Sequence, residues 1–433
     1  MATDRVRVAV FPCGTEIGLE IREALGRCKH VELLGLSSVE SNHGRYRYQE
    51  YEELSLFVSE PGFGEALVQV LQRRSADFLF PAHDDVVVWA AQHQEVLPCP
   101  VLGSPWPTPK ICRDKLLTYR YLASIVRAPK RFPIGDGTHE FPLFLKPRIG
   151  QASRGARLVT SEVDLAEART QPEEYLLMEY LPGQEYTVDC FTDCQGDLRF
   201  VGPRVRHRTM SGIATDTETV RAPDLEAMAC AINSALRFRG AWFFQVKRDI
   251  TGAPVLLEVA PRIAGSSGLW RALNVNLPLL TVYDRMGLTV AVEPLHLPAR
   301  MDRALAARYS LGIVYRHVYI DLDDTLLING KVNLQAVAFL YQCFNHGISL
   351  HLVTRRRAYV REDLERLGLG RLFDRVITVP ETEQKAAYIG EREAIFIDDS
   401  FQEREAVRRV VGIPVFSTDA LGALLEGTPP WGL

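Results

Sequence analysis

Two acidic residues, spaced two positions apart, follow an apolar segment in the C-terminal third of the chain. After the segment HVYI come the residues DLDDTL, which contain Asp321 and Asp323. Because side chains alternate along an extended chain, this spacing can direct both carboxylates into one pocket. One carboxylate of such a pair can attack phosphorus while the other protonates the leaving oxygen. The pattern indicates phosphoryl chemistry, although a single acidic strand end is more often a helix cap or an ion-pair partner.

Further polar residues stand at strand ends or helix starts downstream. Thr354 ends LHLVT, Lys385 lies in ETEQKAAYI, and Asp398 and Asp399 follow AIFI. The ordered set resembles the haloacid dehalogenase (HAD) superfamily of phosphohydrolases over about residues 316 to 425.

This resemblance implies a role for each residue. Asp321 would be the nucleophile that becomes an aspartyl phosphate, and Asp323 the general acid and base. Thr354 and Lys385 would bind and neutralise the phosphoryl group. The implied magnesium ligands are Asp321, Asp323, Asp398 and Asp399. An acid at position 323 favours phosphatase or phosphotransferase chemistry over that of the pump-type members.

The intervals between these motifs are short. Only 28 residues separate Thr325 from Thr354, and 30 separate Thr354 from Lys385. Each interval suffices for one helical crossover of a parallel sheet. We therefore expect no cap domain, and an open site that accepts a bulky phosphorylated substrate or is covered by a neighbouring domain. The run Arg355 to Arg357 could guide an anion, but a solvated helix start is the preferred interpretation.

A second candidate site lies in the middle of the chain. The loop GQASRGA, with Gly150 and Gly155, directly follows a strand that ends at Lys146 and Pro147. Backbone amides in such a loop can cradle phosphates, and a lysine at the strand end can neutralise them. Alone, the loop is as typical of a simple turn.

The order of several segments is more specific than any one of them. They are DK at 114 to 115, LKP at 145 to 147, MEYLPGQEYTVD at 178 to 189, FFQVKRD at 243 to 249 and LLEVAPR at 256 to 262. This order resembles the ATP-grasp superfamily, and most of all its biotin carboxylase and carbamoyl-phosphate synthase branch. The resemblance covers about residues 1 to 300, including a first domain like the pre-ATP-grasp unit of that family.

The resemblance implies that ATP and Mg²⁺ are bound here, with Mn²⁺ as an alternative ion. The lysines would contact the phosphates, the loop 150 to 156 would close over them, the segment 179 to 181 would read adenine with backbone groups, and Glu185 would hold the ribose. The implied ATP-binding residues are Lys115, Lys146, Gly150, Ser153, Gly155, Glu179, Tyr180, Leu181 and Glu185. Gln245 and Glu258 match the metal ligands, and Arg262 would steady an acyl phosphate, because a guanidinium fork suits a phosphoryl group.

Two features of this segment leave alternatives open. The family usually has Asn two residues after the metal glutamate, and this chain has Ala260, which puts a second metal in question. Asp249 could supply the metal ligand that Ala260 lacks, or could belong to a hairpin turn. The cluster Arg204, Arg206, His207 and Arg208 could bind a substrate carboxylate, or could protect a solvated strand edge.

The surrounding pattern predicts a multidomain α/β and α+β protein. Alternating strands and helices from residue 5 to about 110 predict a Rossmann-like parallel sheet. Paired strands with turn residues between them predict an α+β domain next, and a strand over 314 to 325 restarts the βα alternation. The expected domains are a pre-ATP-grasp domain at 1 to 112, an ATP-grasp domain at 113 to 310 and a HAD-like Rossmannoid domain at 315 to 433.

Composition excludes several classes of protein. A hydrophobic fraction of 47% and a charged fraction of 24% are those of a globular chain. A net charge of -4 gives no global field to hold nucleic acid or a membrane. Eight cysteines in 433 residues are too sparse for a disulfide scaffold. We expect a cytoplasmic protein with reduced thiols, no membrane span, and nucleic acid disfavoured as a partner.

Three hypotheses about activity follow from these motifs. The leading one is a bifunctional enzyme: an ADP-forming ligase joins small-molecule carboxylates and amines, and a magnesium-dependent phosphatase acts on a phosphorylated compound shared by both halves. In the second, the ATP-grasp half only binds nucleotide as a regulatory or scaffolding module. In the third, the phosphatase scavenges nucleotides or nucleic-acid ends. A homodimer is compatible with each.

Overall fold

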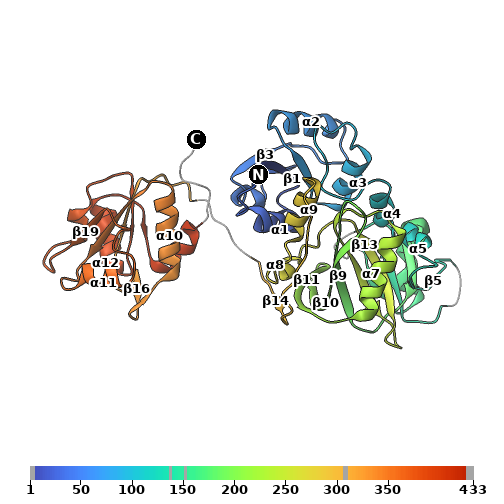
Figure 1. The fold of residues 1–433 in the computed structure, drawn as a ribbon. Coiled ribbons are helices and arrows are strands. Elements are labelled where there is room, and N and C mark those ends of the chain that lie inside the picture. Colours follow the sequence, from blue (N-terminus) through green and yellow to red (C-terminus); the bar gives the residue numbers. More distant parts are fainter. Residues whose placement is uncertain (1–4, 136–138, 151–153, 306–310, 426–433) are drawn as a thin grey trace. The chain divides into compact units, whose positions relative to one another are not determined.

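The computed structural model describes residues 5–135, 139–150, 154–305 and 311–425. The chain divides into two compact units, residues 1–305 and 306–433, and each is described by itself (Figure 1). The expected boundary before residue 315 lies close to this division. The two domains expected before it form a single compact unit. Among the described helices, none is long and apolar enough to cross a membrane.

The N-terminal unit begins with a parallel sheet of order β3-β2-β1-β4. Its strands are β1 (Val6–Phe11), β2 (Val31–Ser37), β3 (Glu50–Glu53) and β4 (Phe78–Pro81). The main helices of this part are α1 (Glu16–Leu25), α2 (Phe63–Arg73) and α3 (Asp84–Gln92). The expected strand-helix-strand opening is confirmed, because the last four residues of β1 are buried between helices and neighbouring strands. After α3, the chain adds only a single parallel bridge to this sheet, between Leu79 and Val101.

Two antiparallel sheets follow in the same unit. The smaller has the order β5-β8-β6-β7 and consists of β5 (Arg131–Phe132), β6 (Leu143–Pro147), β7 (Arg157–Val159) and β8 (Tyr175–Glu179). The larger has the order β13-β12-β9-β10-β11-β14 and consists of β9 (Glu185–Thr192), β10 (Leu198–Met210), β11 (Ile213–Thr219), β12 (Gly240–Arg248), β13 (Pro254–Ala260) and β14 (Arg300–Asp302). The helices that bear on the site are α4 (Thr108–Arg113), α5 (Lys115–Tyr121), α7 (Pro223–Ala235), α8 (Gly268–Arg271) and α9 (Leu277–Arg285).

One hydrophobic cluster explains why the first 300 residues form one unit. Val8 of β1 and Ile21 of α1 pack in the same buried cluster as Phe191 of β9, Trp270 of α8 and Val282 of α9. Burial of apolar surface of this kind contributes roughly 25 cal/mol per Å². Separating the two expected domains would expose that surface.

The C-terminal unit is a parallel sheet of order β19-β18-β15-β20-β21. Its strands are β15 (His317–Ile320), β18 (Ser349–Thr354), β19 (Arg375–Thr378), β20 (Ala394–Ile397) and β21 (Val415–Phe416). The helices are α10 (Leu334–Asn345), α11 (Val360–Arg366), α12 (Phe401–Val410) and α13 (Leu421–Leu424), and a small hairpin pairs β16 (Leu327–Ile328) with β17 (Lys331–Val332).

Two expectations for this unit can be compared with the structure. The strand expected over 314 to 325 covers only 317–320, because the chain turns after Asp321 and Asp324 adopts a left-handed backbone with φ 56°. No cap domain interrupts the sheet: the segment between β15 and β18 holds only the small hairpin and α10, and α11 alone connects β18 to β19. Across both units, all eight cysteines are free, and five of them are buried.

Candidate active sites

One cavity in the N-terminal unit gathers most of the residues that the sequence singled out for this unit. It has a volume of about 440 Å³ and lies between the two antiparallel sheets and the first turn of α3. The predicted residues that line it are Lys115, Lys146, Gly150, Glu179, Tyr180, Leu181, Glu185, Gln245, Glu258 and Arg262. Gly155 does not line it, and Ser153 lies outside the described residues.

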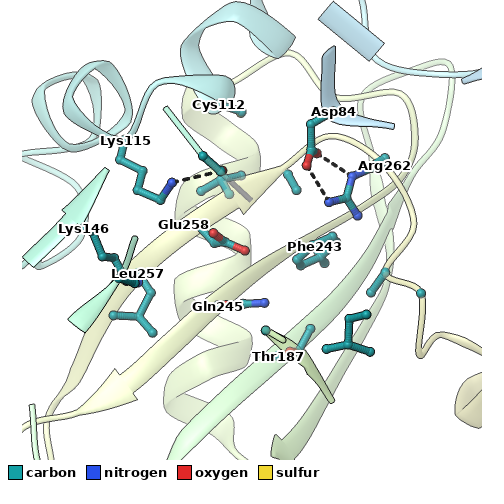
Figure 2. A pocket seen from close by; sticks show the side chains of 18 of the residues that line it. Asp84, Cys112, Lys115, Lys146, Thr187, Phe243, Gln245, Leu257, Glu258 and Arg262 are labelled. Atoms are coloured by element: carbon teal, nitrogen blue, oxygen red, sulfur yellow. Dashed lines mark hydrogen bonds and ion pairs between the residues drawn. The ribbon is translucent and has the colours of Figure 1, made fainter. Parts of the chain in front are cut away.

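The charged and polar groups are ordered across this cavity. Figure 2 shows, from one side to the other, Lys115 and Lys146, then Glu258 and Gln245, then Arg262 with Asp84. Cations at both ends, with a carboxylate and an amide between them, suit a chain of phosphates whose charge must be balanced along its length.

Lys115 is buried and Lys146 is partly buried, and both lie at the ends of regular elements. Asp114 caps α5 by accepting hydrogen bonds from the amides of Leu116 and Leu117, which places Lys115 in the first turn. Lys115 Nζ donates to the carbonyl oxygen of Gly150 at 3.4 Å. Burial lowers the pKa of Lys146, although Glu258 opposes this.

The middle of the cavity is built by two paired strands. Gln245 of β12 and Glu258 of β13 are register partners, so their side chains share a face. Mg²⁺ is usually held in proteins by one or two carboxylates, substrate phosphates and waters, and this donor pair fits such an ion. Ala260 also lines the cavity and offers no ligand atom for a second ion.

Asp249 does not supply the ligand that Ala260 lacks. Its carboxylate accepts hydrogen bonds from the amides of Thr251 and Ala253 and pairs with Arg127. The alternative of a hairpin turn is therefore correct, since these contacts close the turn between β12 and β13.

The last residue of β8 and the first residue of β9 form contacts that the sequence did not reveal. The Glu179 carboxylate accepts a hydrogen bond from the amide of Lys130 at 2.8 Å. Glu185 Oε1 lies 3.0 Å from Arg206 Nε. The residue expected to hold the ribose is thus paired with an arginine of β10.

Arg204 and Arg206 belong to the wall of the cavity. Arg204 is fully buried and its Nε donates to Asp189 Oδ2 at 2.6 Å. Arg206 is 8% exposed and donates to the carbonyl oxygen of Gly212 at 2.6 Å. A solvated strand edge is excluded for both, because β10 lies between β9 and β11.

Arg262 has a partner at the start of α3. Its Nε and Nη2 donate to the two carboxylate oxygens of Asp84 at 2.6 and 3.0 Å. Burial would raise the pKa of Asp84, but Arg262 lowers it to about 2. The sequence analysis did not identify Asp84, although an acidic residue that closely follows a parallel strand was a usable signal.

The C-terminal unit brings its motif residues together at the carboxyl ends of three adjacent strands. Asp321 follows β15, Thr354 ends β18, and Asp398 follows β20. Lys385 lies between two of them, with its Nζ 2.5 Å from Asp321 Oδ1 and 2.7 Å from Asp398 Oδ2. All four side chains are buried.

The buried ion group has shifted pKa values. Burial raises the pKa of Asp321 to about 7, and Lys385 offsets only part of this effect. Burial also raises the pKa of Asp398. For Lys385, burial alone would lower the pKa, but Asp321 and Asp398 raise it above the usual value, so the lysine stays charged.

Three carboxylates here could hold a metal ion. Oxygens of Asp321, Asp398 and Asp399 lie within 4.8 Å of one another. Hard oxygen donors of this kind fit Mg²⁺. Thr325, whose hydroxyl accepts a hydrogen bond from the amide of Asp399 at 3.0 Å, positions one of them.

Asp323 lies outside this carboxylate group, which corrects its expected role as a metal ligand. Its carboxylate pairs with Arg356, and Arg356 Nη1 also contacts Asp363 Oδ2 at 2.8 Å. Arg355 pairs with Glu403. The expectation of a solvated helix start is therefore wrong for Arg355 and Arg356. The contact between Arg356 and Asp323, the proposed general acid and base, was not evident from the sequence.

Comparisons with known proteins bear on the N-terminal unit. The profile of the family described as "ATP-grasp in the biosynthetic pathway with Ter operon" matches residues 171–304. The matched residues all lie within this unit and include β8 to β14. No curated protein matches the sequence.

Solved structures similar to the chain share this ATP-grasp fold. N5-carboxyaminoimidazole synthetase from Staphylococcus aureus, complexed with ADP, is 16% identical over 70% of this chain and 84% of its own, with a TM-score of 0.59. L-amino acid ligase from Bacillus licheniformis is 18% identical over 65% and 74%, with a TM-score of 0.53. The biotin carboxylase domain of 2-oxoglutarate carboxylase from Hydrogenobacter thermophilus, solved with MgADP, ADP and bicarbonate, is 15% identical over 66% and 71%, with a TM-score of 0.55.

Some of the similar structures are much longer than this chain, which matches only part of them. The chain spans 29% of the pyruvate carboxylase of Rhizobium etli, at 15% identity and a TM-score of 0.55. At these identities the likeness concerns the fold.

Proposed function

We propose that the ATP-grasp unit is an ADP-forming ligase that joins a carboxylate to an amine or a similar nucleophile. A carboxylate oxygen attacks the γ-phosphorus of ATP, the bond to the bridging oxygen breaks, and ADP leaves. The amine then attacks the acyl carbon, phosphate leaves, and the amine loses a proton. Magnesium would neutralise phosphate charge when bound.

The observation that carries this proposal is the order of groups across the cavity. Lys115 and Lys146 would bind the phosphates of ATP, and Gln245 with Glu258 would hold the metal next to them. Arg262 at the far end would receive the transferred phosphoryl group. ADP and MgADP occupy the related enzymes from S. aureus and H. thermophilus, which supports ATP and Mg²⁺ as the ligands here.

We further propose that the C-terminal unit is a magnesium-dependent phosphatase of the HAD type. Asp321 would attack phosphorus and release the alcohol of the substrate, and Asp323 would give that alcohol its proton. Water would then hydrolyse the aspartyl phosphate. The support is geometric: Lys385 lies within 2.7 Å of both Asp321 and Asp398, at the sheet edge where Thr354 also ends its strand. Thr354 and Lys385 would bind the phosphoryl oxygens.

The ligase proposal is tested by ADP release from ATP and Mg²⁺ with pooled carboxylates and amines. The assay uses the full chain with Asp321→Asn, so that phosphate released by the C-terminal unit is not mistaken for a product of the ligase. We expect release that depends on a substrate pool and that Lys146→Ala abolishes, whereas Lys110→Ala on the surface of α4 leaves it unchanged. ATP binding with no release from any pool would contradict the ligase.

One observation favours a second candidate for the N-terminal unit. Arg262 is already paired with Asp84, and Ala260 offers no ligand atom to a metal ion. The cavity could therefore bind nucleotide without consuming it and serve only to regulate the phosphatase. In that case ATP would change the rate of phosphate-ester hydrolysis by the full chain without being consumed. Hydrolysis should be lost in Asp321→Asn and kept in the exposed control Asp419→Asn.

A further inference from the structure

Three metal-ligating side chains meet at a second place in the C-terminal unit. His317 is the first residue of β15, His351 lies on the neighbouring strand β18, and Glu391 precedes β20. Asp321 follows the opposite end of β15, so the group is separated from the carboxylates there by the length of the strand. The proposed phosphatase chemistry uses none of these three residues.

The distances within this group suit a metal ion. His317 Nδ1 lies 3.2 Å from His351 Nε2, and one ligand atom from each of the three residues lies within 4.8 Å of the others. In a tetrahedral zinc site with Zn–N bonds of about 2.0–2.1 Å, two ligand nitrogens are roughly 3.3–3.4 Å apart. The two imidazoles therefore already have nearly the spacing of paired ligands.

Neighbouring contacts fix two of the three ligands. The Tyr319 hydroxyl donates a hydrogen bond to the Glu391 carboxylate, an outer contact of the kind that orients metal ligands. The ring of Tyr319 also packs on that of His351, with centroids 4.6 Å apart. His351 is 3% exposed, and its Nδ1 has no hydrogen-bond partner among the described residues. The polar contact of this ring is therefore at Nε2, toward His317.

We propose that His317, His351 and Glu391 form a binding site for a divalent transition metal, with zinc as the expected ion. Two imidazoles and a carboxylate favour zinc over Mg²⁺, which prefers oxygen donors such as those around Asp321. The ion would tie β15 and β18 to the turn before β20 at the amino end of the sheet. A fourth position stays open for water or another ligand. The site does not depend on the proposed function of either unit.

Zinc binding to the full chain tests this proposal. The protein is freed of metal, supplied with excess Mg²⁺ to occupy the carboxylate group near Asp321, and titrated with zinc by calorimetry. We expect one zinc ion bound by the wild type and lost in His317→Gln and in Glu391→Gln. His296→Gln, which changes an exposed histidine of the other unit, should bind as the wild type does. Tyr319→Phe should weaken binding by about 10- to 100-fold.

The stability of each variant without metal shows whether a loss of zinc binding comes from the missing ligand or from unfolding. The variants are compared with the wild type by thermal unfolding in chelator, and His317 is half-exposed, so its substitution should leave unfolding unchanged. Glu391→Gln serves if the His317 variant is unstable. Equal zinc uptake by the wild type and both variants would overturn the proposal, as would no uptake by the wild type.

Discussion

The substitution Asp321→Asn should make the metal-free C-terminal unit more stable at alkaline pH. Asp321 is 4% exposed, and burial raises its pKa from 3.8 to about 7 despite Lys385. A carboxyl group whose pKa is raised on folding contributes stability below its unfolded pKa and loses that contribution as the pH rises through its folded pKa. Asparagine has nearly the same shape and does not ionise, so it avoids this loss.

The size of the effect follows from the pKa shift. The rise from 3.8 to about 7 is about three pH units, and each unit corresponds to about 1.36 kcal/mol. Asp321→Asn should therefore match the wild type near pH 4 and exceed it by up to about 4 kcal/mol above pH 8.

Hydrogen exchange in the presence of chelator measures this difference locally. Amides of Val318 to Ile320 in β15 exchange through opening of the C-terminal unit, so they report its stability and not that of the ATP-grasp unit. Asp419→Asn, an exposed change in the same unit, should show no such pH dependence. If the wild type is the more stable protein at pH 8.5, the pairing with Lys385 outweighs burial and the reasoning is refuted. Added Mg²⁺ should stabilise only the wild type, by mass action.

Three further predictions concern the two sites. Lys146→Ala should weaken ADP binding at least about tenfold by calorimetry, because it removes the cation expected beside the phosphates, while Lys110→Ala should not. Asp84→Asn should destabilise the ATP-grasp unit by about 2 kcal/mol in urea at pH 7, because Arg262 lowers the pKa of Asp84 from 3.8 to about 2. The difference in unfolding free energy between the wild type and this variant should shrink as the pH falls from 4 towards 2. Chelation of Mg²⁺ should abolish hydrolysis of phosphate esters, and Mg²⁺ should restore it; hydrolysis that persists in chelator would contradict a metal-dependent phosphatase.

Residues at strand ends were the most predictable part of both sites. Asp321 and Asp398 each follow a short apolar run, and parallel strands end at one edge of a sheet, so local pattern and topology together bring them near each other. The pairing of Gln245 with Glu258 was less predictable: the register that starts at the turn between β12 and β13 would place Gln245 opposite Leu257, and an irregularity between Gln245 and Val246 brings Glu258 there instead.

Contacts between distant segments were not predictable from local patterns. Asp84 and Arg262 are 178 residues apart, and their contact depends on how the helix α3 packs against the larger antiparallel sheet. Glu185 and Arg206 lie on the adjacent strands β9 and β10, and their contact depends on the register of that pairing. The strand expected to run to residue 325 ended early for a different reason: Asp324 takes a left-handed backbone, which no apolar pattern encodes.

The ion pair between Asp84 and Arg262 also limits how this chain can be rearranged. Thr15, Glu16, His83 and Asp84 come from the first hundred residues, yet they line the same cavity as the nucleotide-facing strands. A truncated protein that starts at α5 would leave the Arg262 guanidinium without its counter-ion and one wall of the cavity open to water. Exchange of the first sheet with that of a relative would therefore change substrate selection as well as folding, and a chimaera would have to retain an acid at position 84.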